Sequence, residues 1–134
     1  MTKGYRARWL VDEERYIEDG CLIVDDGVIE AVGAYDKLRA EFPQVEIETL
    51  DDAAIVPGLV NVHSHAFQRA IRGKTEYISP ENPEDDFWSW RRQMYRAANE
   101  LTADAFEQIA RLTFVEMLRR GITTVGEFHY VHHQ

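Results

Sequence analysis

Short apolar runs separated by turn residues dominate the first fifty residues of the chain. Residues 21–24 and 28–32 flank Asp25-Asp26-Gly27, a spacing that predicts a β-hairpin. Residues 36–42 are mostly good helix formers, so one short helix is expected there. Residues 45–50 alternate apolar and polar side chains, as a half-buried strand does. This part of the chain is therefore predicted to form a small β unit.

A different pattern begins at Pro57-Gly58. The mostly apolar run at residues 59–63 lacks clean alternation, which is typical of a strand covered on both faces in a parallel sheet. Residues 74–86 are polar and contain two prolines, so a long surface loop is expected. Residues 86–96 have the composition of a helix.

A longer helix and a further strand are predicted after that. Thr102 can cap the helix, apolar side chains follow it at helical spacing, and Gly121 can end it. Residues 122–128 are rich in β-branched side chains and predict a strand. Strand, helix and strand in this order indicate a parallel βαβ unit.

Composition narrows the classes of protein. The 134 residues hold 15 Lys and Arg against 24 Asp and Glu, a net charge of −9, and 45% are hydrophobic. With no long basic run, we expect neither a nucleic-acid partner nor a membrane partner. The single cysteine excludes an internal disulfide and favours a reducing, cytoplasmic location.

The main chemical signal is His63-Ser64-His65 at the end of the predicted strand. Residues i and i+2 of a strand point to the same face, so both imidazoles can converge on one metal ion. Sites in α/β folds lie at the carboxyl ends of strands, which favours a metal role. The alternative is that the two histidines only form hydrogen bonds within the core. Two ligands do not complete a catalytic zinc site, which needs about three from the protein.

Three more histidines, His129, His132 and His133, follow the last predicted strand. His129 or Tyr130 can lie at the same carboxyl end of the predicted parallel strands as the histidine pair. Alternatively, Glu127 and these histidines only satisfy backbone groups at the entrance of a loop.

Cations and an amide also stand out in this acidic sequence, namely Gln68, Arg69, Arg72, Arg91 and Arg92. A guanidinium binds carboxylates through two hydrogen bonds, so an arginine near a metal suits a dicarboxylate substrate. The alternative for any one of these arginines is stacking on a surface aromatic ring or capping a helix.

The run from Ile55 to His65, Ile-Val-Pro-Gly-Leu-Val-Asn-Val-His-Ser-His, resembles the first-strand signature of the amidohydrolase superfamily. Together with residues 63–70, 87–91, 94–95 and 127–133, it is similar to the formimidoylglutamate deiminases within that superfamily. These blocks span residues 55 to 134, whereas the β-rich start matches only in general form.

The resemblance implies an α/β fold, the start of a (β/α)8 TIM barrel with its first two strands in residues 55–134. Residues 1–54 would form the N-terminal part of a small β-sandwich domain. It also implies one divalent metal, most commonly zinc, with His63 and His65 as its first two ligands. Gln68, Arg91 and Tyr130 would line the pocket of a small-molecule substrate.

The implied reaction is hydrolysis of N-formimino-L-glutamate to N-formyl-L-glutamate and ammonia, a step of histidine degradation, by an enzyme that forms a homodimer when full length. The later histidines, glutamate and aspartate of the family are not found in the sequence. We therefore expect the N-terminal portion of a longer enzyme, with no catalytic acid or base of its own and no activity alone.

The same sequence features also fit two alternatives. One is another amidohydrolase, such as a guanine or cytosine deaminase, a chlorohydrolase or an imidazolonepropionase. The other is a stand-alone metal-binding module.

Overall fold

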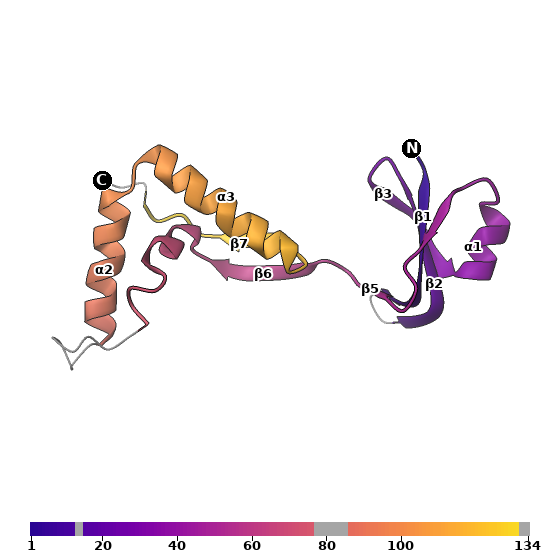
Figure 1. Cartoon of the computed structure of the whole chain (residues 1–134), viewed down its shortest axis with the longest axis horizontal. Coiled ribbons are helices and arrows are strands. Elements are labelled where there is room, and N and C mark those ends of the chain that lie inside the picture. The colour runs from indigo at the N-terminus through magenta and orange to yellow at the C-terminus, as the bar shows by residue number, and fades with distance from the viewer. Residues whose placement is uncertain (13–14, 77–85, 132–134) are drawn as a thin grey trace. The chain divides into compact units, whose positions relative to one another are not determined.

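The computed structural model describes residues 1–12, 15–76 and 86–131 and divides the chain into two compact units (Figure 1). The units are Met1–Pro57 and Gly58–Gln134, and each contains its own sheet and its own apolar cluster. None of the helices in the described part of the chain is long and apolar enough to cross a membrane.

The first unit is a mixed sheet with one short helix, α1 (Tyr35–Glu41). Its strands are β1 (Lys3–Asp12), β2 (Arg15–Asp25), β3 (Val28–Ala34), β4 (Ile47–Thr49) and β5 (Ala54–Ile55). The sheet order is β3-β2-β1-β4, and β5 also pairs with β1. The first three strands are antiparallel, whereas β4 and β5 run parallel to β1. The predicted hairpin is confirmed as β2 and β3, and its turn places Asp26 and Gly27 at φ 46° and 82°.

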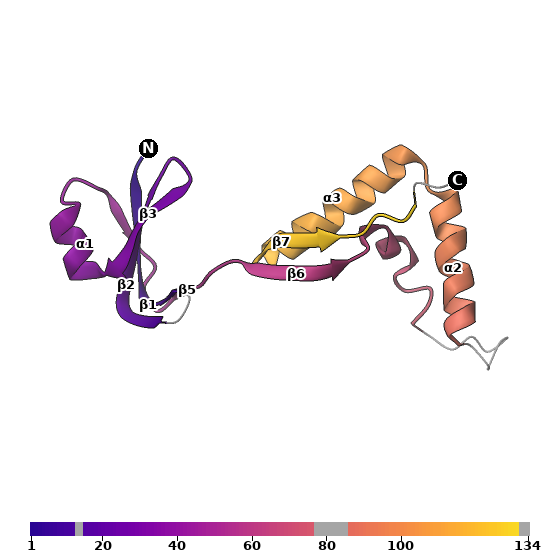
Figure 2. The same cartoon turned by 180° about the vertical axis from the view of Figure 1, so that it is seen from behind.

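The core of this unit lies where α1 packs against β2 and β3 (Figure 2). Cys21, Ile23 and Leu38 are buried there. Beside them, the Arg6 guanidinium donates to both carboxylate oxygens of Asp19, at 2.6 and 2.9 Å, and lies 3.8 Å from the centre of the Tyr35 ring. This ion pair joins β1 to β2 and also covers the first residue of α1.

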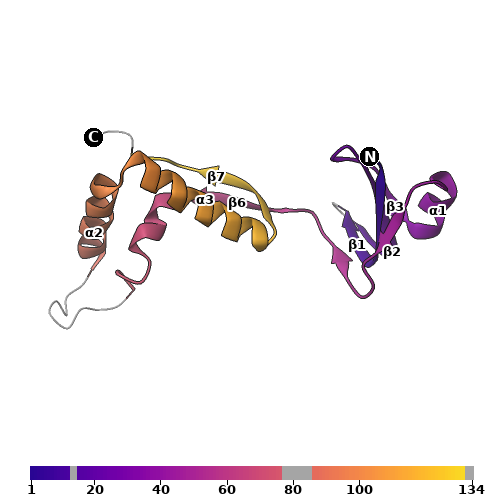
Figure 3. The same ribbon diagram turned by 45° about the horizontal axis from the view of Figure 1, so that its top comes forward.

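The second unit contains two parallel strands, β6 (Leu59–Ser64) and β7 (Ile122–Glu127). Between them in the chain lie the 3-10 helix η1 (Ala66–Ile71), α2 (Phe87–Glu100) and α3 (Ala103–Arg119). Helix α3 runs alongside the strand pair (Figure 3) and packs against β7 and η1. The predicted parallel βαβ unit is therefore confirmed.

The ends of these helices follow from local chemistry. Asp86 caps α2 by accepting hydrogen bonds from the backbone of Trp88 and Ser89, both at 2.9 Å. The Thr102 hydroxyl accepts from the Ala105 backbone at 3.2 Å and begins α3, as predicted. Gly121, with φ 82°, supplies the left-handed residue after that helix. Helix α2 continues to Glu100, beyond the predicted end at residue 96.

The expectation that strand 59–63 is covered on both faces is wrong for the described residues. Val60 and Val62 of β6 are 63% and 83% exposed. The physical reason is that β6 pairs only with β7 in the described part of the chain, so much of its apolar surface has no neighbour there. The predicted loop at residues 74–86 falls mostly on 77–85, outside the described residues.

The core of the second unit lies beyond the carboxyl end of β6. It consists of buried Phe67, Ile71, Met94 and Ala98, with partly buried Trp90, Ala97, Leu101, Phe106, Tyr130 and Val131 packed around them. This cluster joins η1 to α2 and to the residues that follow β7. It therefore fixes the segments on either side of the histidine pair.

Candidate metal centre

His63 and His65 lie at the carboxyl end of β6 and face each other. Their Nε2 atoms are 3.1 Å apart, and their ring centres are 4.9 Å apart. With Zn–N bonds of about 2.0–2.1 Å, two nitrogens 3.1 Å apart subtend about 100° at a shared ion. That angle is close to tetrahedral, so the two donors fit a divalent metal such as zinc.

The other ring nitrogen of His65 also has a partner. Nδ1 lies 3.1 Å from the backbone oxygen of Phe128, the residue directly after β7. A carbonyl oxygen only accepts, so Nδ1 carries the hydrogen and Nε2 keeps its lone pair free for a metal. Next to it, the His63 backbone N–H donates to Oδ1 of Asn61 at 3.1 Å. The strand pair thus holds His65 in the tautomer that a metal ligand needs.

No third ligand joins the pair within the described residues, where no group of three or more histidine, cysteine, aspartate or glutamate side chains is placed to hold a metal. His129 lies near Glu127, with Nδ1 3.6 Å from Oε1, and its ring packs edge-on against Phe106. His132 and His133 lie outside the described residues. Glu127 itself accepts a hydrogen bond from the Ala66 backbone, as the alternative interpretation of this segment expects.

Gln68 and Tyr130 meet beside His65. The Gln68 Nε2 donates to the Tyr130 hydroxyl at 2.5 Å, and the Tyr130 ring packs edge-on against His65, with centres 4.8 Å apart. The Tyr130 phenol is protonated at neutral pH, and burial raises its pKa further above the ordinary value of 10.0. Two of the predicted pocket residues are therefore brought together, directly next to the candidate metal ligand.

Met94 of α2 completes this group; its helical spacing and its place in one of the blocks of the resemblance did not predict this contact. Its sulfur accepts hydrogen bonds from the Tyr130 hydroxyl at 3.1 Å and from Gln68 at 3.4 Å. A buried thioether accepts only weakly. The contact nonetheless fixes which face of α2 lies toward the candidate site.

Arg91, the third predicted pocket residue, does not contact Gln68 or Tyr130. Its guanidinium lies 5.3 Å and 5.5 Å from the ring centres of Tyr95 and Trp88, and Nη2 is 3.3 Å from the Tyr95 hydroxyl. Arg91 precedes Met94 by three residues, so the two share one side of α2, about one turn apart. The guanidinium itself lies beside Trp88 and Tyr95, which are 56% and 44% exposed, while the Met94 side chain is buried.

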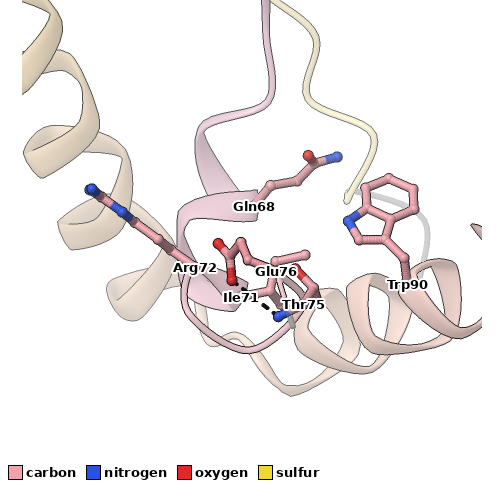
Figure 4. Close-up of a pocket in the computed structure, with 6 residues that line it drawn as sticks. All are labelled: Gln68, Ile71, Arg72, Thr75, Glu76 and Trp90. Carbon is pink, nitrogen blue, oxygen red and sulfur yellow. Dashed lines mark hydrogen bonds between the residues drawn. The ribbon is translucent and has the colours of Figure 1, made fainter. Parts of the chain in front are cut away.

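A pocket of about 360 Å³ opens next to this group. It is lined by Gln68, Ile71, Arg72, Thr75, Glu76 and Trp90 (Figure 4). The Gln68 amide and the Trp90 ring face the same space, whereas the Arg72 side chain extends away from it. A hydrogen-bonding amide and a flat apolar wall are features of a small-molecule site.

The sequence matches known protein families and known enzymes. The Amidohydrolase family profile matches residues 54–134, and the bacterial imidazolonepropionase-like composite domain matches residues 20–44. The chain is 45% identical over 105 residues to formimidoylglutamate deiminase from Pseudomonas aeruginosa, an alignment that covers 78% of this chain and 22% of that enzyme. The chain thus spans about a fifth of the length of this relative.

Two solved structures extend the comparison. Guanine deaminase from Bradyrhizobium japonicum is 28% identical, with a TM-score of 0.77 over 96% of this chain and 29% of that one. An adenosine deaminase from Xanthomonas campestris, solved with bound zinc, is 24% identical, with a TM-score of 0.68 over 95% of this chain and 28% of that one.

The chain belongs to the amidohydrolase family. Its α/β fold matches part of the TIM barrels of that family, as the sequence predicted. The family is one of metal-dependent hydrolases and includes deaminases of small molecules.

Proposed function

We propose that this chain is the N-terminal portion of a metal-dependent deiminase that hydrolyses N-formimino-L-glutamate to N-formyl-L-glutamate and ammonia. The observation that carries the proposal is the facing pair of histidine Nε2 atoms, 3.1 Å apart, beside the bonded Gln68 and Tyr130. The 45% identity to the Pseudomonas aeruginosa deiminase supports this substrate over others.

In this proposal His63 and His65 hold one divalent ion, most commonly zinc. When bound, such an ion supplies Lewis acidity and activates water for attack on carbon at neutral pH. The chain's own part is to present two neutral imidazoles, and the Phe128 carbonyl keeps His65 in the required tautomer. The remaining ligands and the proton-transferring groups would come from outside residues 1–134.

Gln68, Tyr130 and Arg91 are the proposed substrate-binding residues. The Gln68 amide and the Tyr130 hydroxyl offer both donors and acceptors within reach of the His65 ring, which suits the polar formimino group. Arg91 offers a planar pair of donors that matches a carboxylate, and the substrate carries two. The half-buried position of Arg91 on α2, the helix that also carries Met94, supports this role.

The same proposal assigns residues 1–54 to part of a β-sandwich domain and residues 55–134 to the first βα units of a barrel. It also places the complete enzyme in the cytoplasm as a homodimer that acts in histidine degradation. The single cysteine supports the cytoplasmic location.

A second candidate function is deamination of a neutral purine. The 28% identity and TM-score of 0.77 to a guanine deaminase favour it, and Trp90 could stack on a flat ring. A neutral ring gives the Arg91 guanidinium no carboxylate to bind. Arg91 is therefore the residue that separates the two candidates.

Ammonia release by the complete zinc-loaded enzyme tests the proposal. Ammonia release from formiminoglutamate, guanine and cytosine is compared at equal substrate concentration. Turnover of a fourth compound, imidazolonepropionate, is measured by its loss of ultraviolet absorbance. We expect turnover of formiminoglutamate well above the others. If the enzyme turns over guanine and does not turn over formiminoglutamate, the proposed substrate is wrong and the second candidate function replaces it.

A further inference from the structure

Glu127, the last residue of β7, carries a buried carboxylate beside the histidine pair. The side chain is 8% exposed, and Oε1 accepts a hydrogen bond from the Ala66 backbone N–H at 3.0 Å. Within the described residues, Oε2 has no hydrogen-bond partner. Burying a carboxylate with one unpaired oxygen opposes folding, so such a residue is more typical of a functional constraint than of core packing.

The contact falls at a particular place in the chain. Ala66 directly follows His65 and begins η1. The ladder between β6 and β7 is irregular between Asn61 and Ser64 and ends with the pair Ser64 and Glu127, so His65 and Ala66 lie just beyond it. Further hydrogen bonds to the end of β7 hold this part of the backbone. The Phe128 backbone N–H donates to the Ser64 oxygen at 3.1 Å, and the Phe128 oxygen bonds to the His65 ring.

We propose that Glu127 is a positioning residue for the metal. By accepting the Ala66 N–H it fixes the backbone after His65 and keeps the His65 ring directed at His63. The Phe128 carbonyl sets the tautomer of His65, and Glu127 sets where its backbone lies. The inference rests on the proposed function only in taking a divalent ion as resident between the two histidines, and it does not depend on the substrate.

A matched control exists on the same helix. Arg69 of η1 forms a two-pronged ion pair with Glu116 of α3, one contact of which is 2.7 Å. This pair ties η1 to α3 through side chains alone. Removing the Glu116 carboxylate therefore loosens the same short helix without touching the bond at Ala66.

The experiment compares Glu127→Met, Glu127→Gln and Glu116→Met in the complete enzyme. Zinc affinity is measured by competition with a chelator, and the visible absorption of the cobalt-substituted protein reports the arrangement of the ligands. Outer partners of metal ligands change affinity by about 10–100-fold, so we expect a loss of that size and an altered cobalt spectrum in Glu127→Met. Glu127→Gln keeps an accepting oxygen and should stay within about threefold of wild type. Glu116→Met should lower the melting temperature and leave both metal readouts unchanged.

Wild-type zinc affinity and cobalt spectrum in Glu127→Met would overturn the inference, and so would a Gln variant as weak as the Met variant. If Glu127→Met does not fold, Glu127→Asp decides the question, because the shorter side chain withdraws the carboxylate from the Ala66 N–H. Reduced zinc affinity in that variant supports the inference, and wild-type affinity with a wild-type cobalt spectrum refutes it. Since metal binding needs no substrate, these readouts stand even if formiminoglutamate is not turned over.

Discussion

Replacing Arg91 by methionine tests the substrate-binding site most directly, because methionine keeps an unbranched apolar stem and removes the charged guanidinium. In the free protein Arg91 makes two ring contacts and one long hydrogen bond, all to its own helix. Each exposed ring contact stabilises by about 0.5–1 kcal/mol, so the free energy of unfolding should fall by no more than about 2 kcal/mol.

The expected effect on catalysis is larger. If Arg91 binds a substrate carboxylate, losing one partner of that charge pair costs about 2–5 kcal/mol. At about 1.36 kcal/mol per tenfold, kcat/KM should fall by a factor of about 30 to about 5,000. Arg92 is the matched control, since it is exposed and is turned about 100° around the same helix. Arg92→Met should leave kcat/KM within about threefold of wild type.

Truncated substrates complete the assay. N-formimino-γ-aminobutyrate lacks the α-carboxylate, and N-formimino-α-aminobutyrate lacks the side-chain carboxylate. One of these two substrates lacks the carboxylate that Arg91 binds. With that substrate the wild-type enzyme and Arg91→Met should have nearly equal kcat/KM, because the charge pair is already absent. Equal losses in Arg91→Met and Arg92→Met, or a loss that persists with both truncated substrates, would refute the reasoning.

Three further predictions concern metal and stability. A chelator should abolish ammonia release by the complete enzyme, and added zinc should restore it in wild type but not in His63→Ala, as metal analysis can check. Phe67 is fully buried, so Phe67→Ala should lower the free energy of unfolding by about 3–5 kcal/mol in denaturant titrations, whereas exposed Phe87→Ala should cost less than about 1 kcal/mol. The hydrogen bond from Arg6 lowers the pKa of Asp19 below its ordinary 3.8. The stability advantage of wild type over Asp19→Asn should therefore be present above the ordinary pKa of 3.8 and be lost as the pH falls through the lowered pKa of the folded state, which thermal melts at several pH values can follow.

Much of the second unit could be predicted from sequence because its signals are local. Thr102 and Gly121 mark the ends of α3 by their own chemistry, and apolar spacing indicates the helix between them. The histidine pair could be predicted for the same reason, since alternation along one strand is enough to bring two side chains together.

Other features depend on contacts between distant segments. Strand β1 alternates apolar and charged side chains only over residues 5–9, and its full length, Lys3–Asp12, is defined by its pairing with β2, β4 and β5. The bond between Gln68 and Tyr130 joins residues 62 positions apart, and neither periodicity nor spacing reports such a contact. The six residues of η1 are too few to show a helical period, although Phe67 within it anchors the core.

The buried Cys21 allows opening of the first unit to be measured by thiol labelling. Its side chain is fully buried in the sheet, and desolvation raises the pKa of the thiol, so the reactive thiolate is scarce while the sheet is closed. A thiol reagent can reach this sulfur only when β2 and α1 separate. The rate of labelling therefore measures how often the first unit opens. Because this sequence holds no other cysteine, residues 58–134 add nothing to that signal.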